Sequence, residues 1–109
     1  TFTNGENIAD LGGANIAFDA LQMYLKDHGD VEKISGFTQN ERFFIAWATV
    51  WRSLTTDQNL SNQVKTDPHS PDYLRAFAPL TNVDAWYQTF NVKEGDKLYR
   101  KPQDRVKIW

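Results

Sequence analysis

Apolar residues recur at helical spacing along the first quarter of the chain. Thr3 and Glu6 fit a capping box, in which the threonine hydroxyl caps a helix and the glutamate reaches back to it. Gly29 is a residue type that commonly ends a helix, so this helix is expected to stop near His28. The apolar positions that define its buried face are Ile8, Leu11, Phe18, Leu21 and Leu25.

A second helix is expected to open on another capping box, formed by Thr38 and Glu41. The segment 41–54, ERFFIAWATVWRSL, is apolar on nearly every side. Such a pattern is typical of a helix buried at the centre of a structure. A short polar helix is expected to follow over 57–64.

The second half of the chain carries two more helix starts. Ser70 followed by Pro71 is a cap-and-first-turn signal, so a helix is expected over 71–78. Asn82 is placed to cap a further helix over 83–90.

Beyond residue 90 the periodicity is lost. Residues 93–109 are expected to form an irregular C-terminal wrap over the surface, anchored by Tyr99 and Trp109. Because strand patterns are nearly absent, the sequence predicts an all-α fold of five unequal helices that form one unit over 1–109.

Composition narrows the classes of protein that fit this pattern. The chain has 109 residues, 40% of them apolar, which is enough for one core. It has no cysteine, which excludes disulfides and thiolate metal sites. Its net charge is -2 and it carries no polybasic patch, which argues against nucleic-acid binding. The first residue is Thr1 rather than methionine, as expected of a processed or truncated piece.

Glu6 and Asp10 are the first candidates for chemistry, because residues four apart share one face of a helix. Both carboxylates can therefore point at one object, such as a metal ion. The alternative is that Glu6 completes the capping box and that both charges favour the positive end of the helix dipole. Gly12 and Gly13 follow at once and favour a close approach by another backbone.

His69 lies in a loop between Pro68 and Pro71, which restrict the backbone on both sides. Such a loop holds a side chain in one orientation, which suits a catalytic hydrogen-bond donor; local capping or packing is the alternative. Arg75 follows one turn into the next helix and can rise on the same side, although an arginine there is often part of a surface ion pair. His28 is expected only to interact with the dipole of the first helix.

The residues of a complete zinc hydrolase are not all present. Such sites commonly have three protein ligands, with histidines at helical spacing. This chain has two histidines, 41 positions apart, and no His-Glu-x-x-His motif. It also has no Gly-rich phosphate loop and no nucleophile elbow. From the residues alone, the chain is not a complete enzyme.

Residues 6–13 read ENIADLGG, residues 65–71 read KTDPHSP with Arg75 beyond them, and the chain ends in Trp109. Together these features resemble the C-terminal part of the catalytic domain of the neprilysin-like zinc endopeptidases. That family includes neprilysin, endothelin-converting enzyme and the bacterial PepO-type enzymes. The resemblance runs from about Gly5 to Trp109 and implies a helical subdomain of a zincin-like peptidase.

The resemblance also implies a role for each candidate residue. Glu6 matches the third zinc ligand, beside two histidines of an upstream His-Glu-x-x-His helix whose glutamate is the general base. Asp10 matches the carboxylate that orients one of those histidines. His69 matches the residue that stabilises the oxyanion of the tetrahedral intermediate. Arg75 matches an arginine that binds a backbone carbonyl of the substrate.

The family's chains are several times longer, so the resemblance implies a C-terminal fragment of a peptidase. Val106 stands where vertebrate members have a cysteine, which points to a bacterial-type member. The fragment is expected to be inactive without the polypeptide upstream of Thr1, and to self-associate through apolar faces. Its expected partners are that polypeptide and peptide substrates. Family members are membrane-anchored, secreted, periplasmic or, in some bacteria, cytoplasmic.

Two alternatives remain open at this point. The chain could be a non-catalytic helical module in which Trp86 and Tyr87 line a groove for a peptide or a sugar. It could also belong to a degenerate peptidase homologue whose upstream histidines have been lost.

Overall fold

The computed structural model describes residues 2–108 and is all-α over that range, as the sequence predicts. One isolated β-bridge, between Ile34 and Phe37, lies in the loop after the first helix. The helices are α1 (Asn4–His28), α2 (Gln39–Val50), α3 (Asp57–Thr66), α4 (Asp72–Arg75) and α5 (Asp84–Phe90), with short 3-10 helices η1 (Leu80–Asn82) and η2 (Pro102–Asp104).

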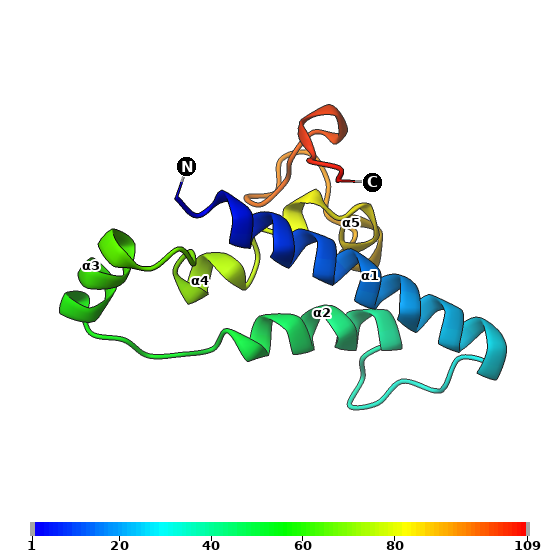
Figure 1. Ribbon diagram of the computed structural model, residues 1–109. Coiled ribbons are helices and arrows are strands. Elements are labelled where there is room, and N and C mark those ends of the chain that lie inside the picture. Colours follow the sequence, from blue (N-terminus) through cyan, green and yellow to red (C-terminus); the bar gives the residue numbers. More distant parts are fainter. Residues whose placement is uncertain (1, 109) are drawn as a thin grey trace.

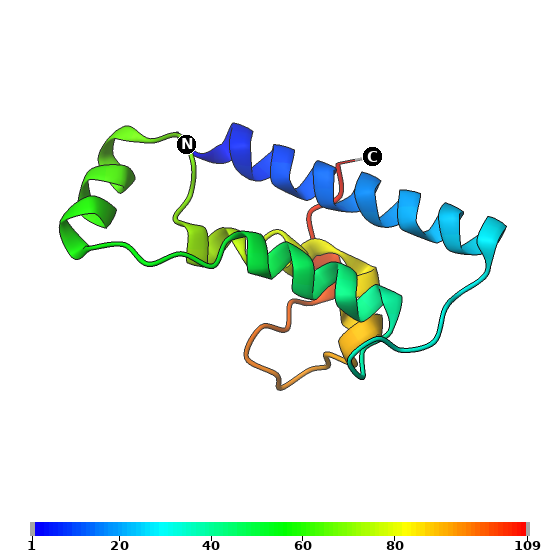
Figure 2. The same ribbon diagram turned by 90° about the horizontal axis from the view of Figure 1, so that it is seen from below.

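The long helix α1 organises the molecule (Figure 1). Helix α2 runs back beside it in the opposite direction, and α5 lies against the pair. Helix α3 stands away from the rest in both Figure 1 and Figure 2, and none of its residues is buried. Helix α3 is therefore an exposed projection from the body that the other helices form.

Aromatic rings hold these helices together. Phe18 of α1 stacks on Phe44 of α2 with ring centroids 5.1 Å apart, and Phe44 is 2% exposed. The hydroxyl of Tyr87 donates to the backbone carbonyl of Thr81 at 2.6 Å, which satisfies a buried polar group. The buried hydrophobic residues are Leu11, Ala14, Phe18, Phe44, Leu80, Val83, Trp86 and Tyr87.

One predicted capping box is confirmed and the other is wrong. The Thr38 hydroxyl accepts from the Glu41 N–H, and the Glu41 carboxylate accepts from the Thr38 N–H. Thr3, by contrast, has helical backbone angles (φ -95°, ψ -3°) and makes no side-chain cap. Its hydroxyl accepts instead from the Asn7 amide at 3.3 Å, and Glu6 is drawn into a tertiary contact.

Other helix ends differ more modestly from the prediction. Helix α1 stops at Gly29 as expected, with φ +80° and its N–H bonded to the carbonyl of Leu25. Helix α4 ends at Arg75 rather than at residue 78, and turns lead on to η1. Asn82 does not cap α5: its side-chain oxygen accepts from the Arg100 guanidinium and the Val106 N–H, both at 2.9 Å.

The C-terminal segment is irregular apart from η2, and Arg105, whose side chain is 9% exposed, holds it. The guanidinium of Arg105 lies 3.5 Å from the ring centroid of Tyr87 and donates to the Asp84 carboxylate at 2.8 Å. This hydrogen bond lowers the pKa of Asp84. Tyr99 packs against the core, as the sequence suggests, and Trp109 lies outside the described residues.

Helix α2 is much less buried than its sequence predicts. Phe44 is its one buried residue, while Val50 is 74% exposed. The radius of gyration is 15.4 Å, against about 13 Å for a compact chain of this length. No helix among residues 2–108 is both long and apolar enough to cross a bilayer. Large apolar side chains that stay exposed include Ile16, Met23, Val50 and Leu54.

We expect the 109-residue chain to self-associate, because exposed apolar surface of this kind drives association. Sedimentation should give a mass that rises with concentration above the 12.6 kDa of the monomer, together with binding of a hydrophobic dye. Replacing Ile16 and Val50 by glutamate should lower both signals. A monodisperse monomer that binds no dye would contradict this prediction.

Candidate active site

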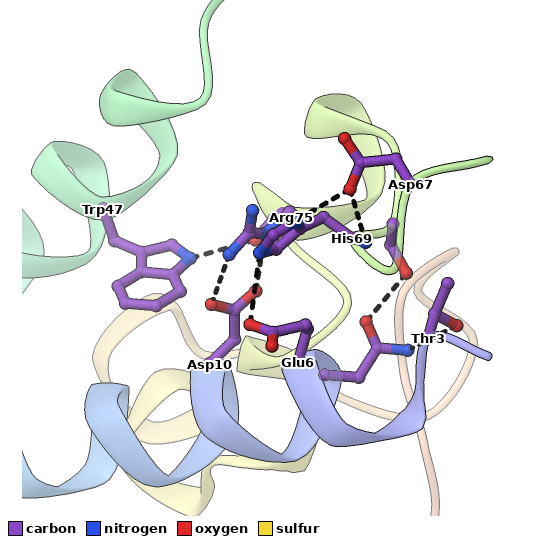
Figure 3. A network of polar contacts seen from close by, with 9 residues as sticks. Thr3, Glu6, Asp10, Trp47, Asp67, His69 and Arg75 are labelled. Carbon is purple, nitrogen blue, oxygen red and sulfur yellow. Dashed lines mark hydrogen bonds and ion pairs between the residues drawn. The ribbon is translucent and has the colours of Figure 1, made fainter. Parts of the chain in front are cut away.

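The first two turns of α1 present the predicted pair of carboxylates on one face, as their spacing requires (Figure 3). The Glu6 side chain is 44% exposed, whereas that of Asp10 is 11% exposed. Glu6 thus faces outward from this chain and Asp10 lies beneath it. The two carboxylates do not share a partner: Glu6 contacts His69, and Asp10 contacts Arg75.

The loop before α4 carries His69 to the first of these carboxylates. His69 Nε2 lies 3.2 Å from Glu6 Oε2, although the two residues are 63 positions apart. On the other side of the ring, Nδ1 lies 2.7 Å from Asp67 Oδ1. The same Asp67 oxygen accepts the backbone N–H of His69 at 2.8 Å. Asp67 therefore fixes both the backbone and the ring of the histidine.

This double contact defines what the ring can do. A neutral imidazole has one N–H, so it donates to one carboxylate and offers a lone pair to the other. Only the doubly protonated ring of His69 can donate to Asp67 and Glu6 together. With Nδ1 held by Asp67, Nε2 is the nitrogen that faces the Glu6 carboxylate. That arrangement suits a hydrogen-bond donor whose direction is set in advance.

Arg75 and Asp10 form a two-pronged pair below the histidine. Arg75 Nε donates to Asp10 Oδ2 at 2.7 Å, and Nη2 donates to Oδ1 at 2.8 Å. The Arg75 side chain is 14% exposed, so the pair is largely removed from water. Hydrogen bonding to Asp10 raises the pKa of Arg75, which keeps the guanidinium charged. The pair joins α1 to α4 at the floor of the site.

Two tryptophans, Trp47 of α2 and Trp51 directly after its end, complete the surroundings of the arginine. The Arg75 guanidinium carbon lies 3.8 Å from the ring centroid of Trp51, a cation–π contact. The indole N–H of Trp47 donates to the Arg75 backbone carbonyl at 3.0 Å. Sequence reasoning treated both rings as core residues. Their spacing of four places both rings on one side at the end of α2, but nothing in the sequence pairs that side with Arg75.

The four predicted site residues, Glu6, Asp10, His69 and Arg75, thus meet in one place. Sequence reasoning missed Asp67, Trp47 and Trp51. For Asp67 a signal existed, because an aspartate two residues before a loop histidine can bond its backbone and ring. His28 lies apart from the site: its ring stacks on Tyr24 with centroids 4.1 Å apart, and Nδ1 contacts the carbonyl of Tyr24.

Breaking the Asp10–Arg75 pair should destabilise the chain. Asp10→Asn leaves a mostly buried guanidinium without its counter-charge, which costs about 3 kcal/mol, the lower end for such pairs since neither partner is fully buried. Urea unfolding at one fixed protein concentration measures the loss. The matched control is Lys107→Gln, because the Lys107 side chain is 69% exposed and its ion pair with Asp84 should be worth at most about 1 kcal/mol. Equal losses in the two variants would contradict the prediction.

The Asp67 carboxylate should stabilise the fold only at pH values at which it is ionised. Hydrogen bonds from the His69 backbone N–H and then from its ring lower the pKa of Asp67 below 3.8. A folded-state pKa below the unfolded one gives stability that is present above about pH 4 and is lost as the pH falls through the folded value. Asp67→Asn should therefore flatten the fall in stability below about pH 4. An unchanged acid limb in unfolding measurements would contradict this prediction.

The chain alone does not offer a full set of metal ligands. Among residues 2–108 there is no cluster of three histidine, cysteine or acidic side chains able to hold a metal ion. Glu6 nevertheless suits a single ligand, because its carboxylate is exposed and only Oε2 faces His69. Carboxylate oxygen is a regular zinc donor in sites completed by histidines. Glu6 therefore fits the role of one zinc ligand, in a site that other residues complete.

Comparison with known proteins identifies the family. The sequence pattern of peptidase family M13 matches residues 1–106. The chain belongs to peptidase family M13. Neutral endopeptidase of Lactococcus lactis is 41% identical over 104 residues, which cover 95% of this chain and 15% of the relative. Endothelin-converting enzyme 1 of Cavia porcellus is 35% identical over 109 residues, which cover 98% of this chain and 14% of that enzyme.

A solved M13 structure shows the same fold. The zinc metalloprotease Zmp1 of Mycobacterium tuberculosis, in complex with an inhibitor, superposes with a TM-score of 0.94 at 44% identity. The match covers 99% of this chain and 16% of Zmp1. The neprilysin-like family and the all-α fold expected from the sequence are therefore confirmed. The chain spans about one seventh of the length of the M13 relatives it matches.

Proposed function

We propose that this chain forms part of the active site of a zinc-dependent M13 endopeptidase that hydrolyses peptides. The observation that carries the proposal is the 3.2 Å contact between Glu6 and His69. It joins the two motifs that resemble the family's site, although they lie far apart in the sequence. The names of the relatives, neutral endopeptidase and zinc metalloprotease, support the reaction class.

Within this proposal, Glu6 is the zinc ligand that the chain contributes. Two histidines of an upstream His-Glu-x-x-His helix would complete the ligand set. Bound zinc would polarise a substrate carbonyl and lower the pKa of a water molecule. The open surface at Gly13, where an added Cβ would meet no atom within 4 Å, leaves room beside α1 for the helix that carries those histidines.

His69 would stabilise the negative charge that develops on the carbonyl oxygen of the scissile bond. Asp67 holds Nδ1, so Nε2, which contacts Glu6 in this chain, is the nitrogen that would donate to the substrate once Glu6 binds zinc. A donor fixed in direction before the reaction stabilises this charge without having to reorganise. Asp67 supports this role as a positioning residue.

Asp10 and Arg75 would act together. A carboxylate has about four acceptor sites, so Asp10 can hold Arg75 and still orient an upstream histidine. The two bonds to Asp10 use the Nε and Nη2 of Arg75, which leaves Nη1 for a backbone carbonyl of the peptide. Without upstream histidines, the 109-residue chain would have one zinc ligand and no activity.

The proposal is tested on the full-length protein, with its upstream polypeptide. We expect it to cleave oligopeptides, to lose that activity with a zinc chelator, and to regain it when zinc is returned. A full-length protein that contains the upstream motif yet shows no chelator-sensitive cleavage would overturn the proposal. The same failure with the upstream histidines missing would identify a degenerate homologue.

The alternative of a binding module loses its main support. Trp86 and Tyr87, which were to line a groove, are 8% and 5% exposed and belong to the core. Neither ring is available to a peptide or a sugar.

A further inference from the structure

A second contact joins the histidine loop to α1. The Ser70 hydroxyl donates to Asn7 Oδ1 at 2.7 Å. Ser70 directly follows His69 and Asn7 directly follows Glu6, so this bond lies next to the contact between His69 and Glu6. The Asn7 amide is itself oriented, because its Nδ2 donates to the Thr3 hydroxyl at 3.3 Å.

No residue of the loop over 67–71 is fully buried. A hollow of about 460 Å³ lies beside it, lined by residues of α1, α4 and the C-terminal segment, with Arg75 among them. Asn7 and Ser70 both line it, with the apolar side chains of Ile8, Leu11 and Leu74. A polar contact at the edge of such a hollow has more effect on the position of the loop than the same contact in a packed core.

The contact between His69 and Glu6 cannot hold the loop on α1 during catalysis. In the proposed function Glu6 binds zinc and His69 binds the substrate oxygen. Among the polar contacts of residues 67–71 in the described chain, the bond from Ser70 to Asn7 is then the one that still reaches α1.

We infer that Asn7 is a positioning residue, which acts through Ser70 to keep His69 at the distance from Glu6 that catalysis requires. The inference rests on the proposed function. Asn7 touches neither zinc nor substrate in this account. Its loss should therefore lower turnover while leaving zinc content and substrate binding in place.

The test uses full-length protein with Asn7→Ala, Ser70→Ala and the double variant. Each single change should lower kcat about 10-fold, roughly the value of one net hydrogen bond. KM and zinc content should not change. The double variant should be no slower than either single variant, because both remove the same bond. Ser70→Thr keeps the hydroxyl and should restore most of the rate.

The matched control is Gln22→Ala, which removes a bond of the same kind. Gln22 Nε2 donates to Asn40 Oδ1 at 2.8 Å, joining α1 to the start of α2 away from the site. This variant should keep wild-type kcat. Additive losses in the double variant, a fall in zinc content, or an equal loss of kcat in the control would overturn the inference.

Hydrogen exchange separates this inference from the proposed function. The His69 amide, which is bonded to Asp67, should exchange faster in Asn7→Ala than in wild type. Faster exchange in a protein without peptidase activity would support the positioning role of Asn7 and contradict the proposed function. Unchanged exchange together with unchanged kcat would overturn the positioning role of Asn7 and leave the proposed function standing.

Discussion

Replacing Glu6 by glutamine in the full-length protein is expected to remove both zinc and peptide hydrolysis. The amide has nearly the same size but carries no charge, so it is a much poorer ligand for a divalent cation. The loss of affinity should exceed the roughly 10- to 100-fold that follows the loss of an outer partner of a zinc ligand. Zinc content after dialysis and the rate of peptide cleavage measure the two effects.

The fold of α1 should survive this change, because Glu6 does not close a capping box. Thr3 makes no side-chain cap, and Glu6 is 44% exposed. Glu41→Gln is the matched control, since Glu41 does close the box at the start of α2. That variant should lose up to about 1 kcal/mol of stability and keep its zinc. A Glu6→Gln protein with full zinc content and an unchanged rate would show that Glu6 is only a surface residue.

Replacing His69 by phenylalanine is expected to lower kcat by about 10² to 10³, the usual effect of losing one oxyanion donor. The phenyl ring fills the same space but has no N–H to offer. Zinc content should not change, because His69 is not a ligand in this account, and KM should change little. Steady-state kinetics on a chromogenic or fluorogenic peptide separate these quantities.

His28→Phe is the control for that experiment, because His28 is the other histidine of the chain. Its ring stacks on Tyr24 near the far end of α1. The control should leave kcat unchanged. Loss of zinc from the His69 variant, or equal loss of activity in both variants, would contradict the role proposed for His69.

The sequence predicted helices well where a local signal was unopposed. The capping box at Thr38 formed, with the Glu41 carboxylate accepting the Thr38 N–H. The same pattern at Thr3 failed, because Asn7 takes the threonine hydroxyl and Glu6 faces His69. Asn82 likewise gave up its expected cap for contacts to Arg100 and to the Val106 backbone. In each case long-range or side-chain contacts outweighed a local preference.

The burial of α2 was overestimated for a different reason. An apolar pattern reports that a face will be covered but not by what. Within residues 2–108, Val50 and Leu54 are uncovered. The pattern alone therefore does not show what covers these side chains.

The site residues were predictable and their pairing was not. The i, i+4 rule placed Glu6 and Asp10 on one face, the proline-flanked loop singled out His69 with Arg75 beyond it, and the resemblance implied a role for each. None of these indicated that Asp10 would hold Arg75 or that Trp51 would cover the guanidinium. Such contacts join residues 24 or more positions apart and leave no periodic trace in the sequence.

The most direct test of the account is a crystal structure of the full-length protein with diffraction data collected at the zinc absorption edge. We expect an anomalous peak about 2.0–2.2 Å from a carboxylate oxygen of Glu6, the usual zinc–carboxylate distance. His69 should lie beside that peak without binding it. A zinc peak elsewhere, with Glu6 bonded only to His69, would contradict the assignment of Glu6 as a zinc ligand.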